Sequence, residues 1–191
     1  MRGRSGVSEI ISTLMMVSLT VVGSLLLYSY IHGYVHVEHL RIRHESITLT
    51  GYDSRDGGRV GGMLSIDNRT DGMLCAASCN PHRSPSSNGT EFIVLYIKNT
   101  SNNGISIGGI IINKAMHTWS GSMPPDGGTF SIVTGEDTAQ ATNEIPPLTT
   151  ARILVKLSDR IEDIPLGSTI EVSIPLAESV YRDRIVAGDV R

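Results

Sequence analysis

Charged residues are absent from one long stretch of this 191-residue chain, and aromatic residues are scarce throughout. Residues 10–31 contain no Asp, Glu, Lys or Arg, and only 5% of all residues are Phe, Trp or Tyr. An excess of basic residues is also lacking, since 16 Lys and Arg stand against 19 Asp and Glu, a net charge of −3. Proteins that bind nucleic acid need a basic face to neutralise phosphates, so the composition argues against that class.

The uncharged stretch is long enough to form a membrane-spanning helix. A helix over residues 10–31 rises roughly 33 Å, and the hydrocarbon core of a bilayer is about 30 Å thick. Arg2 and Arg4 precede it with no acidic residue before Glu9, which favours a cytoplasmic amino terminus. A cluster of tyrosines, typical of a membrane–water boundary, lies at its other end: Tyr28, Tyr30 and Tyr34.

The residues at the start of this helix form a recognisable motif. Segment 6–14 reads Gly-Val-Ser-Glu-Ile-Ile-Ser-Thr-Leu. It resembles the class III signal peptide of archaeal type IV pilins and archaellins, in which a short basic leader ending in Gly precedes the helix. The resemblance implies that a prepilin peptidase cuts between Gly6 and Val7 and leaves the helix attached. That family commonly has Lys or Arg directly before the terminal Gly, whereas Ser5 stands here, so a cut after Gly3 is the alternative.

The same resemblance gives the helix an assembly role. In that family the mature helices leave the bilayer and pack together as the core of a filament. The free amine of Val7 and the carboxylate of Glu9 would then neutralise one another between subunits, because an unpaired buried charge is costly. Small residues on one helix face would allow close approach of neighbouring helices: Thr13, Thr20, Gly23 and Ser24. Alternatively, the hydroxyl residues are merely tolerated in a single anchor helix.

Beyond Tyr34 the sequence alternates between apolar and polar residues, with the period of two that half-buried strands show. The alternation begins at Val35, which argues that the helix ends near Tyr34. Turn-forming Gly, Pro, Asn and Asp residues separate the strand-like segments. Further strands are predicted at residues 60–66, 92–98, 105–113, 129–133, 152–157, 169–174 and 180–187.

These patterns predict an α+β chain in which a long hydrophobic helix precedes an all-β antiparallel sandwich. The resemblance to archaellins and archaeal pilins implies that this sandwich is immunoglobulin-like. The predicted organisation is a leader peptide over residues 1–6, a membrane and filament-core helix over 7–34 and an extracellular β domain over 35–191. Three polar segments are predicted as loops: 67–90, 117–127 and 134–148.

Cys75 and Cys79 are the two cysteines of the chain, and both lie in the first predicted loop. An even cysteine count outside the membrane favours a disulfide between them. Free thiols are one alternative, and a zinc site that recruits His82 is another, although two cysteines alone do not form such a site.

Three Asn-x-Ser/Thr acceptor sequences for N-linked glycans occur in the predicted β domain. They begin at Asn68, Asn88 and Asn99, each in or beside a predicted turn where a sugar would stand in solvent. Archaeal surface filaments are frequently glycosylated, so the resemblance supports occupancy of at least one of them.

Four histidines lie close together at the end of the predicted helix: His32, His36, His39 and His44. On a continuing helix the first three would share a face, a spacing that can hold a divalent cation. The alternation from Val35 argues against such a helix, so we expect polar boundary residues and no metal site.

No catalytic motif is found. The chain has no Gly-x-Ser-x-Gly elbow and no glycine-rich phosphate loop of the Walker or Rossmann kind, so we expect neither an enzyme nor a cofactor. Trp119, the one tryptophan, is placed in a polar loop, either as a contact residue or as a cap on the sandwich edge.

The sequence therefore predicts a structural subunit of an archaeal pilus-like surface filament that serves adhesion or surface attachment. Its expected partners are further copies of itself, a prepilin peptidase and, before assembly, the cytoplasmic membrane. An archaellin of a motility filament is the first alternative. A membrane-anchored module that binds a surface-layer protein or a ligand is the second.

Overall fold

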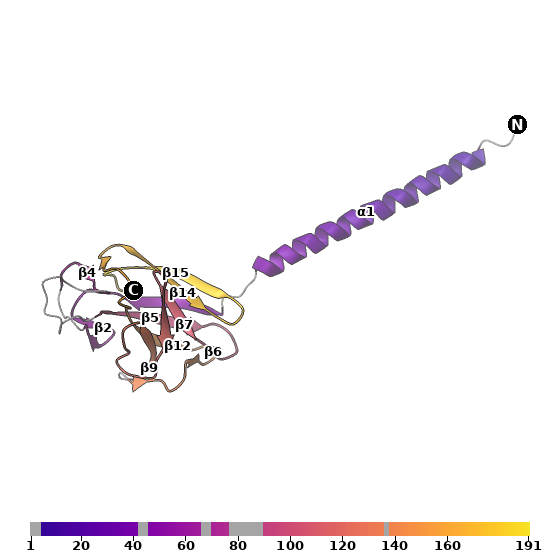
Figure 1. Ribbon diagram of the computed structural model, residues 1–191. Coiled ribbons are helices and arrows are strands. Elements are labelled where there is room, and N and C mark those ends of the chain that lie inside the picture. The colour runs from indigo at the N-terminus through magenta and orange to yellow at the C-terminus, as the bar shows by residue number, and fades with distance from the viewer. Residues whose placement is uncertain (1–4, 42–45, 66–69, 77–89, 136–137) are drawn as a thin grey trace. The chain divides into compact units, whose positions relative to one another are not determined.

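The chain divides into two units in a computed structural model (Figure 1), residues 1–44 and residues 45–191. The structure describes residues 5–41, 46–65, 70–76, 90–135 and 138–191, and within the first of these ranges it describes the side chains of residues 8–30. Among these residues, the first unit contains one helix and the second contains the strands.

Helix α1 (Ser5–Arg41) is longer than the sequence predicts. It contains no proline, and it continues seven residues beyond Tyr34 through the segment in which alternation had indicated a strand. Extending an existing helix by one residue fixes one residue for one new hydrogen bond, whereas starting a strand requires a partner. The prediction that the helix ends near Tyr34 is therefore wrong, and the first strand begins only at Ile47.

Within its described residues the β domain contains fifteen strands, several of them only two residues long. Their bounds are β1 (Ile47–Asp53), β2 (Arg59–Val60), β3 (Met63–Leu64), β4 (Met73–Leu74), β5 (Phe92–Asn99), β6 (Ile105–Ser106), β7 (Gly109–Ile112), β8 (Ala115–Trp119), β9 (Thr129–Thr134), β10 (Thr138–Ala139), β11 (Glu144–Ile145), β12 (Thr150–Lys156), β13 (Ile164–Pro165), β14 (Thr169–Pro175) and β15 (Val180–Val186). The prediction of an α+β chain with an antiparallel-rich β domain is confirmed.

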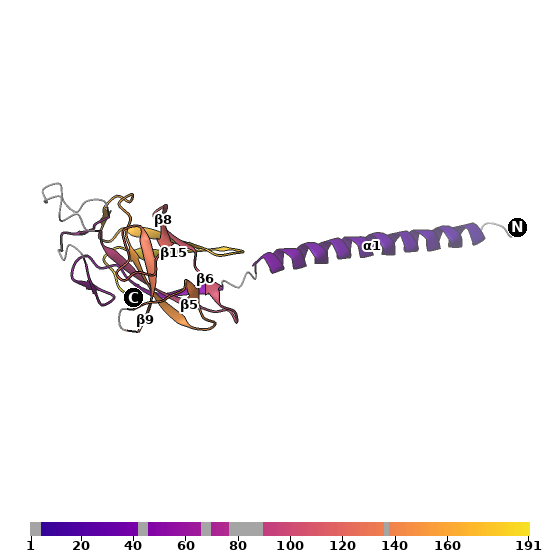
Figure 2. The same cartoon turned by 60° about the horizontal axis from the view of Figure 1, so that its bottom comes forward.

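The long strands form one sheet in the order β1-β5-β12-β9-β8-β7-β14-β15, with β10 paired to β9. All neighbours on this path are antiparallel except β8 and β9, which are parallel. The sheet folds over so that β8 and β15 lie on one side of the domain and β5 and β9 on the other (Figure 2).

The two ends of the sheet meet at the carboxyl terminus. Asp53 at the end of β1 bridges Val190, and the backbones of Tyr52 and Arg191 exchange hydrogen bonds of 3.1 and 2.9 Å. Side chains replace backbone pairing nearer the start of β1, where the Leu49 amide donates to the hydroxyl of Tyr181 at 3.0 Å. The folded sheet is thus closed along part of its seam.

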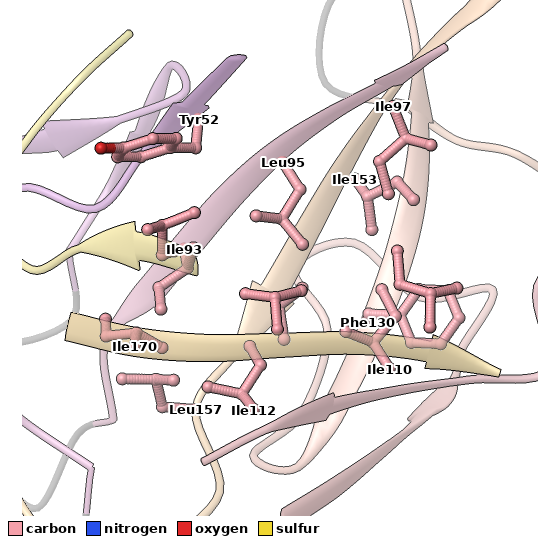
Figure 3. Packing of buried hydrophobic residues seen from close by; sticks show 14 of the residues in the cluster. Tyr52, Ile93, Leu95, Ile97, Ile110, Ile112, Phe130, Ile153, Leu157 and Ile170 are labelled. Atoms are coloured by element: carbon pink, nitrogen blue, oxygen red, sulfur yellow. The ribbon is translucent and has the colours of Figure 1, made fainter. Parts of the chain in front are cut away.

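The core lies between the two sides of this folded sheet. Figure 3 shows isoleucine and leucine side chains of β5, β7 and β12 meeting Phe130 of β9 and Ile170 of β14. Strand β14 alternates buried and exposed residues, as expected for a strand with one face in solvent. Strand β5 is buried on both faces along most of its length.

A short hairpin, β2–β3, explains the double burial of β5. Val60 of this hairpin packs with Phe92, Val94 and Leu154 on the outer face of the sheet. The hairpin turn contains Gly61, at a φ of 57°, and a Cβ atom there would overlap the side chain of Val94. Glycine is required because both the backbone conformation and the close approach exclude a side chain.

Each of the three predicted loops contains strand residues. Strand β8 extends to Trp119, β4 lies within segment 67–90, and β10 and β11 lie within 134–148. These pieces have two to five residues. The positions of such short strands are set by pairing with distant segments, and so few residues give little periodic signal in the sequence.

Candidate functional site

The surface of helix α1 is the most unusual feature of the described residues. Segment Ser8–Tyr30 is 23 residues long, has a mean hydropathy of 2.2, and none of it is buried. Its large apolar side chains are at least half exposed, and Leu19 is 78% exposed. Burying one such side chain contributes about 1.5–3 kcal/mol, so this surface requires an apolar surrounding. A helix of this kind is typical of a membrane anchor or a signal sequence.

Several hydroxyl groups of α1 are satisfied within the helix. Thr13 donates to the carbonyl oxygens of Glu9 and Ile10 at 2.9 and 3.0 Å. The hydroxyls of Thr20 and Ser24 likewise donate to carbonyl oxygens three or four residues earlier, at 2.8 to 3.1 Å. An apolar surrounding therefore does not leave these groups without a partner.

The helix has two distinguishable faces. One is a shallow apolar hollow of about 510 Å³, lined by Ile11, Leu14, Met15, Ser18, Leu19 and Val22. At 3.6 residues per turn, the predicted stripe of Thr13, Thr20 and Ser24 lies on the opposite side. Gly23 lies beside that stripe with open space above its Cα atom. Ridges on a second helix can pack into grooves of this kind.

The predicted processing site lies at the start of the same helix. The backbone of Gly6 and Val7 is helical, and the side chain of Val7 lies outside the described residues. The side chain of Glu9 is exposed, one turn before Thr13 and on the same face. The structure therefore brings Glu9 and the hydroxyl stripe together on one face, and their roles stay predictions.

No family model matches this chain, and no curated protein matches it either. The resemblance noted above therefore depends on the motif at residues 6–14 and on the apolar helix that the structure shows.

Asn99, one of the three predicted glycan acceptors, is 0% exposed. Its Nδ2 group donates to the carbonyl oxygens of Asn103, Ile145 and Pro146 at 2.8, 3.0 and 3.1 Å. Its Oδ1 atom accepts hydrogen bonds from the amide and the hydroxyl of Ser101. The nitrogen that would carry a sugar is thus enclosed, so the folded domain does not offer Asn99 as an acceptor. Its role is to hold two loops together.

The remaining predicted sites of the β domain lie mostly outside the described residues. Cys75 is disulfide-bonded, whereas Cys79, the other cysteine of the chain, lies outside the described residues, as do the acceptor residues Asn68 and Asn88. Glycosylation at the last two positions stays a prediction.

A buried carboxylate that sequence reasoning missed organises the backbone beside Cys75. Glu91 is 1% exposed, and its Oε2 atom accepts a hydrogen bond of 2.9 Å from the Cys75 amide. Its Oε1 atom accepts from the Ser65 hydroxyl at 2.7 Å and from the Gly57 amide at 3.3 Å. One carboxylate thus joins three segments. An acidic residue directly before the apolar run of β5 was the available signal.

The histidine cluster needs a correction. The backbone of His32, His36 and His39 is helical, since α1 extends to Arg41, so the alternation that argued against a shared face no longer applies. Their side chains, and His44 entirely, lie outside the described residues. Among the residues that are described, no group of three His, Cys, Asp or Glu side chains could hold a metal ion.

His117 is buried in β8 and is held in one tautomer. Its Nε2 atom lies 3.2 Å from the Ser158 amide and accepts its hydrogen bond, so Nδ1 carries the proton and donates to the Ala115 carbonyl oxygen at 3.1 Å. Burial disfavours the charged imidazolium and lowers the pKa of His117 below its usual value. This histidine is a structural part of the domain.

Proposed function

We propose that this chain is a subunit of an archaeal type IV pilus-like surface filament that serves adhesion or surface attachment. In this proposal a prepilin peptidase removes residues 1–6, and the helix then leaves the cytoplasmic membrane and packs with other copies. The β domain forms the outer surface of the filament.

The observation that supports the proposal most is the apolar surface of segment Ser8–Tyr30, none of which is buried. This segment is preceded by the leader motif and followed by a β domain that has its own closed core. A bilayer can cover the helix before assembly, and packed copies can cover it afterwards. The two opposite faces of α1 give each copy two different surfaces, and heterologous contacts of that kind generate helical filaments.

A singly anchored chain is the second candidate, and the hydroxyl groups of α1 favour it. Because Thr13, Thr20 and Ser24 donate to carbonyl oxygens of their own helix, they need no partner helix in lipid. In that case the β domain would bind a surface-layer protein or a ligand outside the cell.

Intact mass spectrometry of the membrane-extracted chain tests processing. A mass that lacks Met1 to Gly6 is expected, and a mass that retains them contradicts the processed-pilin proposal. Electrophoresis of filaments sheared from cells then tests assembly. A processed chain that is missing from the filaments would favour the anchored module.

The proposed charge role of Glu9 is tested by Glu9→Gln. Processing should continue, whereas the yield of sheared filament should fall at least about tenfold, because the amine of Val7 would lose its partner in the apolar core. Glu178→Gln, which neutralises an exposed glutamate of the β domain, is the matched control. An equal yield from both variants would remove the charge role.

A further inference from the structure

The outer surface of β7, β14 and β15 carries a groove lined by charged and hydroxyl-bearing side chains. Two adjoining open hollows of about 480 and 600 Å³ share Glu171 and Arg184. Cross-strand pairs form the floor, since Glu171 lies opposite Arg184 and Ser173 lies opposite Arg182. These strands are neighbours in Figure 1. We call this surface the cationic groove and define it by Lys114, Thr169, Glu171, Ser173, Arg182 and Arg184.

Lys114 is fixed at one end of the groove by the turn between β7 and β8. Both turn residues have positive φ angles, 44° at Asn113 and 72° at Lys114, a conformation that residues other than glycine rarely adopt. Asn113 forms two hydrogen bonds with Glu171 of β14: its amide donates to the Glu171 carbonyl oxygen at 3.1 Å, and its Oδ1 atom accepts from the Glu171 amide at 3.0 Å. The turn therefore places a cation beside β14.

The positive charges of the groove exceed what its carboxylates can neutralise. Three cationic side chains, Lys114, Arg182 and Arg184, stand against two carboxylates, Glu171 and Asp183. The Asp183 carboxylate accepts hydrogen bonds from two neutral donors, the Tyr181 hydroxyl and the Arg184 amide, at 2.8 and 2.7 Å. The Glu171–Arg184 pair is 3.6 Å long, and its side chains are 62% and 74% exposed. Such a pair is weak in water. Within the described part of the chain, Lys114 and Arg182 form no ion pair.

The spacing of the arginines indicates a ligand with repeated anionic groups. Arg182 and Arg184 are two residues apart on one face of β15, so their Cα atoms are about 6.6–6.8 Å apart. A guanidinium group binds a carboxylate through two parallel hydrogen bonds. The hydroxyls of Thr169 and Ser173 are suited to bind sugar hydroxyls.

From this geometry we infer that the cationic groove binds a linear polysaccharide whose sugar units carry carboxylates. Nucleic acid fits less well, because the lining contains no aromatic side chain on which a base could stack, and the chain has a net charge of −3. The groove lies wholly within the β domain, so the inference does not depend on assembly into a filament.

Calorimetric titration of the full chain in detergent micelles with alginate oligosaccharides, a polyuronate, tests this inference. The oligomer should bind at least about tenfold more tightly than monomeric glucuronate, because only the oligomer can engage both arginines. Neutral dextran should not bind. Absence of alginate binding to the wild-type chain would overturn the inference, and so would tighter binding of polyglutamate, which would assign the groove to acidic peptides.

Two sets of variants locate the binding. The double variant R182Q/R184Q should weaken alginate binding at least about tenfold. The matched control K98Q/R160Q removes two exposed positive charges elsewhere on the domain and should change it less than about twofold. Glu171→Gln frees Arg184 and should strengthen binding about two- to fivefold. Equal weakening by both double variants, or weaker binding of Glu171→Gln, would contradict the assignment to this groove.

Discussion

Helix α1 and the β domain both provide hydrogen-bond partners for polar groups, but they differ in the exposure of their apolar side chains. The Thr20 hydroxyl in the helix and the Asn99 amide in the domain both bond to carbonyl oxygens of the same chain. Leu19 in the helix is 78% exposed, whereas Leu95 in the domain is 0% exposed. The domain thus supplies partners for its own apolar surface. The helix supplies partners for the hydroxyls of Thr13, Thr20 and Ser24 but needs an external partner for its apolar side chains.

The largest expected effect comes from the same substitution in the two regions. Leu95→Ala should lower the free energy of unfolding of the β domain by about 2–5 kcal/mol, since it leaves a cavity in the core. Leu19→Ala should change it by less than about 0.5 kcal/mol, because it removes an exposed side chain. Urea unfolding in micelles, followed by Trp119 fluorescence, reports on the β domain alone, because Trp119 is the only tryptophan. Equal losses of unfolding free energy in the two variants would contradict this difference between the helix and the domain.

The second expected effect concerns the buried amide. Asn99→Ala should destabilise the domain by about 2 kcal/mol, because it leaves the buried carbonyl oxygen of Ile145 and its neighbours without a donor. Asn99→Asp keeps the shape but cannot donate, so it should cost a similar amount in the same urea titration. A variant as stable as the wild type would show that water replaces the amide. A glycan found by mass spectrometry on Asn99 of the folded protein would contradict its enclosure.

The third effect is a pH dependence of the stability of the β domain, which contains the buried His117, whereas segment 8–30 of the helix contains no histidine. The folded pKa of His117 lies below its usual value of about 6.5. The unfolded chain therefore binds more protons below pH 6.5, and stability should fall as the pH falls from there towards the folded pKa. The slope is at most about 1.4 kcal/mol per pH unit. Protonation would also point a second N–H group at the Ser158 amide.

Unfolding free energies measured between pH 7.5 and 5 check this contribution. His117→Gln is the control, because glutamine does not titrate in this range while every carboxylate of the domain is kept. The wild type should lose more stability than the variant over that interval. Parallel curves would show that His117 does not titrate between the two states.

Strong local patterns predicted much of the fold. The predicted strand 92–98 differs from β5 (Phe92–Asn99) by one residue, and the predicted strand 180–187 differs from β15 (Val180–Val186) by one. Both segments are rich in β-branched and aromatic residues with turn formers nearby, so local preference and tertiary pairing agree. The apolar run of α1 predicts a helix equally clearly, because a strand rarely contains so many consecutive uncharged residues.

The same patterns failed where the decisive partner is far away in sequence. Segment 35–41 fits an alternating strand as well as a helix, and continuation of α1 decided between them. The role of Asn99 depends on Ile145, 46 residues later. Glu91 depends on Gly57, 34 residues earlier. A buried polar residue is interpretable only with its partners, and those are set by the folded sheet.

The smallest expected effect separates backbone strain from side-chain contact at one exposed position. Leu148 is 61% exposed and has a φ of 57°, a conformation that costs an L residue about 1–2 kcal/mol and costs glycine almost nothing. Leu148→Gly should be more stable than Leu148→Ala by about 0.5–1 kcal/mol, after the larger chain entropy of unfolded glycine is subtracted. Both variants lose the same exposed side chain, so their difference in urea titrations isolates the backbone. A more stable alanine variant would show that Leu148 is not strained in this turn of the β domain.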